Sequence, residues 1–164
     1  MSTMSPLRRT LAVAGAAALA LGLAACSSGG ETRDEAGEIV SGGDTDVFTI
    51  KIGDCFNDVD SDSEEISSLP TVPCAEAHDN EVYAETSLTG DEYPGDDVVA
   101  QQADQYCYEQ FSAFVGVDYE SSTLEYYPIT PLQGGWEQLG DRLVSCVVYD
   151  PAESTTGSLA GAAR

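Results

Sequence analysis

Four cysteines constrain the fold of this chain more strongly than any other feature of its sequence. Cys55, Cys74, Cys107 and Cys146 are spread over its central and C-terminal parts, and a fifth cysteine, Cys26, follows an apolar N-terminal segment. If the chain is exported, an even number of cysteines in a small domain indicates disulfides. Structural zinc sites instead favour ligands paired at short spacing, and no two of these cysteines lie within four residues of each other. We therefore predict two disulfides, no metal site and no cofactor.

Four cysteines can pair in three ways. Cys107 lies in a helix-like pattern and Cys146 in a strand-like run, so a helix lying on a sheet would bring the two together. Cys55 and Cys74 flank an acidic segment and would close it as a loop. We expect the pairs Cys55–Cys74 and Cys107–Cys146, each stabilising the fold by roughly 3–4 kcal/mol through the entropy of the unfolded chain.

The first 25 residues have the pattern of a lipoprotein signal peptide. Arg8 and Arg9 precede residues 11–25, which contain only Ala, Leu, Val and Gly. That apolar run is shorter than the roughly 20 residues that span a bilayer core, and a short charged segment followed by such a run is typical of an export signal. The run ends at Leu23-Ala24-Ala25-Cys26, which resembles the bacterial lipobox. This resemblance implies cleavage before Cys26 and attachment of lipid to its sulfur.

The segments that follow differ in composition and suggest the domain boundaries. Residues 26–46, rich in Gly, Ser and acidic residues, are predicted to form the lipidated cysteine and a flexible acidic tether. Residues 47–150 are predicted to form one domain, and residues 151–164 a loose tail. The net charge of −23 disfavours binding to nucleic acid and to anionic lipid head groups. We therefore expect the membrane contact to be the covalent lipid.

Residue patterns predict an α+β fold in which a small antiparallel sheet packs on one main helix. Apolar residues recur every three or four positions over 96–116, with acidic residues in the first turn and a Gly at the end, as in an amphipathic helix. Alternating or continuous apolar runs predict strands at 47–55, 80–88, 122–129 and 142–150. Residues 130–141 are expected to form a loop with at most one helical turn.

Several short motifs, taken in order, resemble one family. They are "IGDCF" (52–56), "VPCAEAHDNEVY" (72–83), "YPG" (93–95), the cysteine of the predicted helix, Trp136, "GDR" (140–142), "YDP" (149–151) and "TGSL" (156–159). Together they resemble the actinobacterial septum-formation domain. In that family the second motif reads Cys, three residues, His, an acid and then Glu-Val, often with Pro where this chain has Ala77. The resemblance implies an exported or membrane-tethered envelope protein with a role in cell division and with no catalytic residues.

The second motif holds the only histidine of the chain and supplies most of the candidate binding residues. We single out His78, Asp79, Glu81 and Trp136 as possible binding positions. His78 has no complete catalytic constellation around it, since the chain lacks a GxSxG elbow and its cysteines are expected to be paired. The simpler interpretation is that His78 hydrogen-bonds the backbone near Cys74. We therefore expect a protein that is not an enzyme.

These observations predict a lipid-anchored protein on the extracytoplasmic face of the cell membrane. It would act as a binding or interaction module for a protein partner in the envelope, linked by resemblance to septum formation. The alternative is a lipoprotein that binds cell-wall glycan or a small ligand. Asp58, Asp60 and Asp62 match the first ligands of a calcium loop, but Ser63 and Leu69 replace the Gly and Glu that complete it, so any Ca²⁺ binding would be weak.

Overall fold

The computed structural model describes residues 29–59 and 66–164. The predicted signal peptide and Cys26 lie outside these residues, as do Asp60 and Asp62. The strands are β1 (Thr32–Arg33), β2 (Ile39–Ser41), β3 (Gly43–Asp46), β4 (Cys55–Phe56), β5 (Ser68–Val72), β6 (Ala77–His78), β7 (Asn80–Ser87), β8 (Glu125–Ile129), β9 (Leu143–Tyr149) and β10 (Thr155–Thr156). The helices are α1 (Asp96–Val115), the short 3-10 helix η1 (Tyr119–Ser121) and α2 (Gln133–Gln138).

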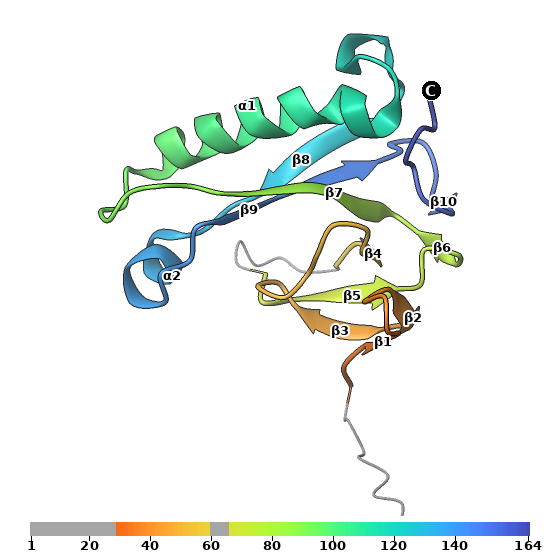
Figure 1. Ribbon diagram of the computed structural model, residues 1–164, viewed down its shortest axis with the longest axis horizontal. Helices are drawn as coiled ribbons and strands as arrows, with labels where there is room; N and C mark the ends of the chain where they lie inside the picture. Colours follow the sequence, from red (N-terminus) through yellow and green to blue (C-terminus); the bar gives the residue numbers. More distant parts are fainter. Residues whose placement is uncertain (1–28, 60–65) are drawn as a thin grey trace, which may run out of the picture.

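The main sheet has six strands in the order β3-β5-β4-β7-β9-β8, and all its pairs are antiparallel. Figure 1 shows α1 lying along one side of β7, β8 and β9, with β3 and β5 on the other side. There are two small two-stranded sheets, the N-terminal hairpin β1–β2 and the pair β6–β10, which joins the middle of the chain to its C-terminal segment. The predicted α+β class, with one main helix on an antiparallel sheet, is confirmed.

The two faces of the sheet pack against different parts of the chain. In β9, Val144, Cys146 and Val148 point to the α1 side, where they meet Cys107 and Phe111. Val147 points to the opposite side. There the second apolar cluster contains Ile50, Phe56, Leu69 and Val82, with Tyr127 and Ile129 packed against it. Alternation along β9 thus produces two cores, because neighbouring residues of a strand point to opposite faces.

Helix α1 forms where the sequence predicts it. Asp96 and Asp97 occupy the first turn, where carboxylates interact favourably with the helix dipole. Gly116 ends the helix with φ 92°, a left-handed conformation that a residue with a Cβ adopts at a cost. In β7 the register shifts between Val82 and Ala84. At this bulge the neighbours Tyr83 and Ala84 both lie on the helix side, and the Tyr83 hydroxyl donates to the Cys107 carbonyl at 2.6 Å.

Both expected disulfides are present. Cys107–Cys146 joins α1 to β9, with 5.4 Å between the Cα atoms. Cys55–Cys74 joins β4 to the segment that follows β5, with 5.2 Å between the Cα atoms. The first links the helix to the sheet, and the second closes the segment between β4 and β6.

The strand predicted at 47–55 is wrong. Residues 47–49 form a turn directly after β3, and pairing resumes only at β4. Asp46 explains the turn, because its carboxylate accepts the backbone N–H of Phe48 at 2.9 Å and its carbonyl accepts the N–H of Thr49 at 2.8 Å. Such a local side-chain hydrogen bond offers the backbone an alternative to strand pairing.

The folded part of the chain extends beyond residues 47–150 at both ends. Within the predicted tether, β1 and β2 form a hairpin, and β3 pairs with β5 along its whole length. Within the predicted tail, β10 pairs with β6, and Leu159 is buried in the α1 core. Residues 32–46, predicted as a flexible tether, therefore belong to the fold, and the predicted loose tail is docked. Within the described residues, no helix is long and apolar enough to cross a membrane.

We predict that the two disulfides stabilise the fold by similar amounts. The bridges close segments with sequence separations of 19 and 39 residues. Replacing Cys55 and Cys74 by Ala should lower the free energy of unfolding by about 3 kcal/mol, and replacing Cys107 and Cys146 by about 4 kcal/mol, if loop entropy dominates. Chemical denaturation of each double variant beside the oxidised wild type measures both values. A loss below about 1 kcal/mol for either pair would contradict the entropic account.

Candidate functional site

His78 lies in β6 and is fully buried. Its Nδ1 lies 2.9 Å from the carbonyl oxygen of Glu76 and donates to it, since a carbonyl can only accept. Its Nε2 lies 3.2 Å from the hydroxyl of Thr155, which is in β10. Both ring nitrogens are therefore used within the chain. The contact with the Glu76 carbonyl is the backbone hydrogen bond near Cys74 that the simpler interpretation predicts, and the contact with Thr155 additionally joins this segment to the C-terminal segment.

Glu81 and Asp79 also hold the C-terminal segment. The Glu81 carboxylate is buried and accepts the hydroxyl of Ser158 and the backbone N–H of Leu159, both at 2.6 Å. Asp79 accepts the hydroxyl of Ser154 at 2.7 Å and the backbone N–H of Asp58 at 3.1 Å. The Ser154 hydrogen bond is the main reason that the pKa of Asp79 lies below its usual value. In the described structure, these two carboxylates bind the protein's own chain.

Trp136, the fourth candidate residue, is 1 % exposed in α2. The guanidinium carbon of Arg142 lies 3.7 Å from the centroid of its ring, and its indole N–H donates to the Asp91 carbonyl at 3.3 Å. Arg142 also donates to the Trp136 carbonyl at 2.9 Å. The ring therefore fastens α2 to the loop before α1. A glycan-stacking platform needs an exposed aromatic face, and Trp136 does not present one.

One group of described metal-ligand side chains comes together, and its chemistry does not suit a metal. Cys55, Cys74 and Glu81 place their ligand atoms within 4.8 Å of one another. The two sulfur atoms are joined as a disulfide, so neither is a thiolate that can coordinate a metal. Of the aspartates in the calcium-like pattern, the structure describes Asp58. Its Oδ1 accepts the side-chain N–H of Asn80 at 2.8 Å.

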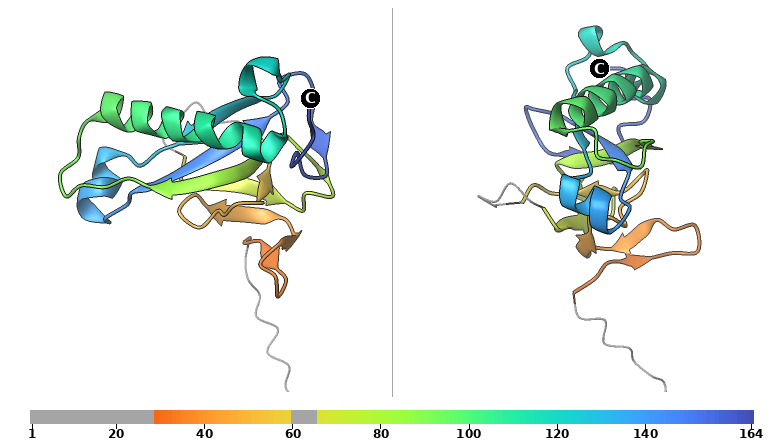
Figure 2. Two further views of the ribbon diagram at one scale, coloured as in Figure 1. Left: turned by 45° about the horizontal axis from the view of Figure 1, so that its top comes forward. Right: turned by 90° about the vertical axis from the view of Figure 1, so that its left-hand side faces the viewer.

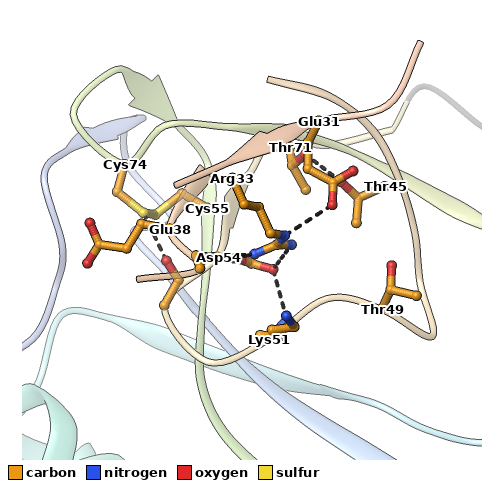
Figure 3. Close-up of polar contacts among 12 residues, drawn as sticks. Glu31, Arg33, Glu38, Thr45, Thr49, Lys51, Asp54, Cys55, Thr71 and Cys74 are labelled. Carbon is orange, nitrogen blue, oxygen red and sulfur yellow. Dashed lines mark hydrogen bonds and ion pairs between the residues drawn. A yellow bond between two sulfur atoms is a disulfide. The ribbon is translucent and has the colours of Figure 1, made fainter. Parts of the chain in front are cut away.

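An ion pair fastens the N-terminal hairpin to the rest of the fold (Figure 3). Arg33 in β1 donates through both terminal nitrogens to Asp54, with both N–O distances at 2.7 Å. Asp54 is buried, and it also accepts the backbone N–H of Lys51 at 2.8 Å. Its carboxylate raises the pKa of Arg33, which also donates to Glu31 at 3.1 Å. This arrangement holds residues 31–33 against the loop before β4.

We predict that the Arg33–Asp54 pair contributes strongly to stability. Arg33→Gln would leave the Asp54 carboxylate buried without its cation, which should lower the free energy of unfolding by about 3 kcal/mol. Arg164 offers a comparison because it forms an ion pair with Asp150 at 2.7 Å in which the carboxylate is similarly buried, 6 % exposed, whereas the Arg164 side chain is 42 % exposed. In Arg164→Gln water can reach the site from the exposed side, so the loss should be smaller, about 1 kcal/mol. Urea denaturation compares the two variants, and equal losses would show that the Arg33–Asp54 pair gains nothing from the burial of its cation.

A groove lies on the face of β8 and β9 that is turned away from α1. It encloses about 970 Å³ between these strands, the turn after β3, the segment around β4 and the α2 region. Tyr127 and Ile129 of β8 line it, and so does Ser145 of β9. The Tyr127 hydroxyl donates to Asn80 at 3.2 Å, and burial raises the pKa of Tyr127 above its usual value. This hydroxyl is therefore neutral at physiological pH.

Exposed apolar side chains gather at this groove. Eight large hydrophobic side chains are exposed among the described residues, and four of them line the groove. These four are Phe48, Ile66, Leu132 and Leu139, which are between 45 % and 73 % exposed. They come from three separate parts of the chain. Single exposed hydrophobic residues are common on protein surfaces, but a cluster at a concave site marks a candidate binding surface.

A smaller recess adjoins the groove. It encloses about 630 Å³, and the groove and the recess share Phe48 and Leu143 as lining residues. Glu85 of β7 lines the recess, and its Oε1 is buried without a hydrogen-bond partner. Burial is the main cause that raises the pKa of Glu85, and the nearby charge of Asp54 adds to the effect. Lys51 also lines the recess, and within the described residues it forms no ion pair.

The groove and Glu85 were missed from the sequence. The sequence pattern places Phe48 in a strand, where alternation would turn it to one face of the sheet. Leu132 and Leu139 lie in a Gly-rich stretch that is predicted as a loop with at most one helical turn, whereas residues 133–138 form α2. Two leucines in this polar stretch are the one available signal. Glu85 sits in a correctly predicted strand as an ordinary polar residue facing water. Its surroundings come from the turn after β3, which the sequence pattern did not reveal.

We predict that Glu85 makes the fold less stable at neutral pH than it is in acid. A carboxylate whose pKa is raised by folding favours the protonated form, so stability is lost as pH rises from about 4, the ordinary Glu value, through the raised pKa. Glu85→Gln should therefore raise the melting temperature at pH 7 and leave it nearly unchanged below about pH 4.

The control is Glu109→Gln, which removes the same charge from an exposed position on α1. Thermal unfolding followed by circular dichroism over a pH series tests the difference between the two variants. If Glu85→Gln destabilises the protein at pH 7, Glu85 has a stabilising partner in the free protein and the prediction is wrong.

A protein-family model described as septum formation matches residues 6–163 of the chain. The match includes both disulfides, the His78 segment and every strand that lines the groove. No curated protein and no solved structure matches the chain.

Proposed function

Because this chain belongs to the septum-formation family, we propose that it is a lipid-anchored binding module that acts on the extracytoplasmic face of the membrane at the division septum. The lipid on Cys26 would hold the protein at the membrane, and the groove would bind a protein partner of the envelope. The proposal assigns no catalytic step to the chain.

One observation carries the binding role. Half of the large exposed hydrophobic side chains in the described structure lie around a single groove. A soluble surface has no structural need for such a cluster, since exposed apolar side chains contribute little to the stability of the free protein. Binding of a partner that covers them would bury this area and stabilise the complex.

The sequence supports the location. Residues 8–26 have the charged segment, the apolar run and the terminal cysteine of a lipoprotein signal. Two disulfides suit an oxidising compartment outside the cytoplasm. The first described strand, β1, begins six residues after Cys26. An extended chain of that length spans at most about 20 Å, so the lipid would keep the domain close to the membrane surface.

The septal role is tested by imaging the full chain with a fluorescent tag at its C-terminus in dividing cells. We expect enrichment at new septa that is lost in Cys26→Ser and reduced in Leu139→Asp, since aspartate at a 73 % exposed position should weaken apolar binding without unfolding the protein. Val98→Asp places the same change on an exposed residue of α1 and should have no effect.

Each part of the proposal can fail separately in this experiment. A uniform membrane signal from the wild type would contradict the septal role. Septal enrichment that survives Cys26→Ser would contradict anchoring by lipid. Enrichment that is equal in Leu139→Asp and Val98→Asp would contradict a role for the groove in recruitment.

A further inference from the structure

This inference rests on the binding role proposed above, which does not specify the chemistry of the partner. The side chains that line the groove and its recess indicate which chemical class of partner would fit. We propose that the occupant is a protein segment in which apolar side chains are followed closely by a Lys or Arg. The apolar side chains lie among Phe48, Leu132 and Leu139, and the cationic side chain reaches the carboxylate of Glu85.

The register of the sheet places Glu85 in line with the groove. Ile129 of β8 lies opposite Ser145 of β9, and Ser145 lies opposite Glu85 of β7. The three residues form one row across the sheet, on the face turned away from α1. Neighbouring strands lie about 4.8 Å apart, so Glu85 is roughly 10 Å from Ile129. A Lys or Arg side chain can cover much of that distance from a backbone seated over β8 and β9.

Glu85 is the carboxylate in this region that lacks a cation or a donor. Its Oε1 is buried without a partner, and the described residues donate no hydrogen bond to its carboxylate. Glu85 is half-buried as a residue, and a polar oxygen buried without a hydrogen-bond partner costs free energy. A cation from a partner would neutralise it, and the partner's own surface would exclude water and strengthen the attraction.

The cations already present do not fill this role. Arg33 lines the recess, but its guanidinium is taken up by Asp54, Glu31 and the carbonyl of Gly37. Lys51 is exposed and forms no ion pair with Glu85 among the described contacts. The charge of Lys51 lowers the pKa of Glu85, but burial, the largest cause, outweighs it and the pKa of Glu85 is raised.

Charge favours a cationic partner over a second copy of this chain. The net charge is −23, so two copies repel each other. The groove itself is lined by Asp58 and Asp141, and no Lys or Arg is among its described lining residues. A cationic segment is attracted by this field, whereas an acidic one is repelled.

The test is selection of peptides from a phage-displayed random library on the full chain, purified with its disulfides oxidised. We expect the enriched peptides to combine apolar residues with a nearby Lys or Arg. On Glu85→Gln the preference for the cation should disappear while the apolar preference remains. On Leu139→Asp the apolar preference should weaken. Enrichment of acidic peptides, or of neutral apolar peptides on the wild type, would overturn the proposal.

A synthetic peptide with the selected sequence then gives the magnitude. Its Kd should rise at least about tenfold on Glu85→Gln, as expected for the loss of a charge-assisted hydrogen bond. Glu109→Gln, which removes a charge from α1, should leave the Kd within about twofold, since screening weakens the effect of distant surface charges. If the peptide loses the same affinity for both variants, the effect would come from the net charge of the protein, and the proposed contact of the cation with Glu85 would be wrong.

This experiment fails independently of the imaging experiment. If the protein is enriched at septa but the selected peptides lack Lys and Arg, the proposed function stands and the inference about the partner is wrong. If the selected peptides contain Lys or Arg but the protein is not enriched at septa, the inference stands and the septal role is wrong. Glu85→Gln is expected to fold at least as stably as the wild type, so a loss of binding in this variant cannot be attributed to unfolding.

Discussion

The Cys107–Cys146 disulfide fixes α1 on one face of β9, and the rest of the architecture depends on this placement. The helix covers its face along β7, β8 and β9, where Phe111, Ala103 and Val115 fill the space. Among the described residues, the opposite face has only the short helix α2, at the edge of the groove. The rest of this face is covered by β4, β5 and the turn after β3, which reach Val82 and Val147 but leave part of β8 and β9 open. The groove is therefore a consequence of covering the two faces unequally.

The covering of that second face depends in turn on the N-terminal segment. Strand β3 pairs with β5, and the hydroxyls of Thr45 and Thr71 lie 2.6 Å apart across the pair in the buried interior (Figure 3). The Arg33–Asp54 ion pair then holds the β1–β2 hairpin against the loop that leads to β4. The views in Figure 2 show this hairpin at the end of the molecule opposite α1. The β1–β2 hairpin therefore lies on the side of the sheet that carries the groove.

Elements stabilised by their own local sequence could be predicted from it. The α1 pattern contains its apolar spacing, its acidic first turn and its terminal glycine within the same stretch of chain. Strand β7 was predictable from apolar residues that alternate with polar ones, and strand β9 from a nearly continuous apolar run. The disulfide between α1 and β9 followed from these two elements, because a helix packed on a sheet brings Cys107 near Cys146.

The misassigned elements are held by contacts between distant residues. The predicted tether is ordered by Arg33 bonding Asp54, and the predicted tail by Glu81 accepting from Ser158 and Leu159, 77 and 78 residues further along the chain. Neither contact can be recognised from the sequence of the predicted tether or of the predicted tail, because both segments are polar and rich in Gly. The hydrogen bonds of His78 could likewise be predicted only in part. Glu76 is two residues away, whereas Thr155 is 77 residues away and leaves no signal in the local sequence.

Contacts between distant residues also change how the "HDNEV" segment of the family motif is interpreted. The residues of the "HDNEV" segment look like a site because they are ionisable and close together, yet the structure uses them to fasten the C-terminal segment. Buried polar residues that are fully bonded stabilise one arrangement of the chain, because each lost bond leaves an unsatisfied group. Glu85 is the contrasting case, since its buried oxygen has no internal partner. A carboxylate oxygen buried without an internal partner, beside a groove of exposed apolar side chains, is better explained by binding than by folding.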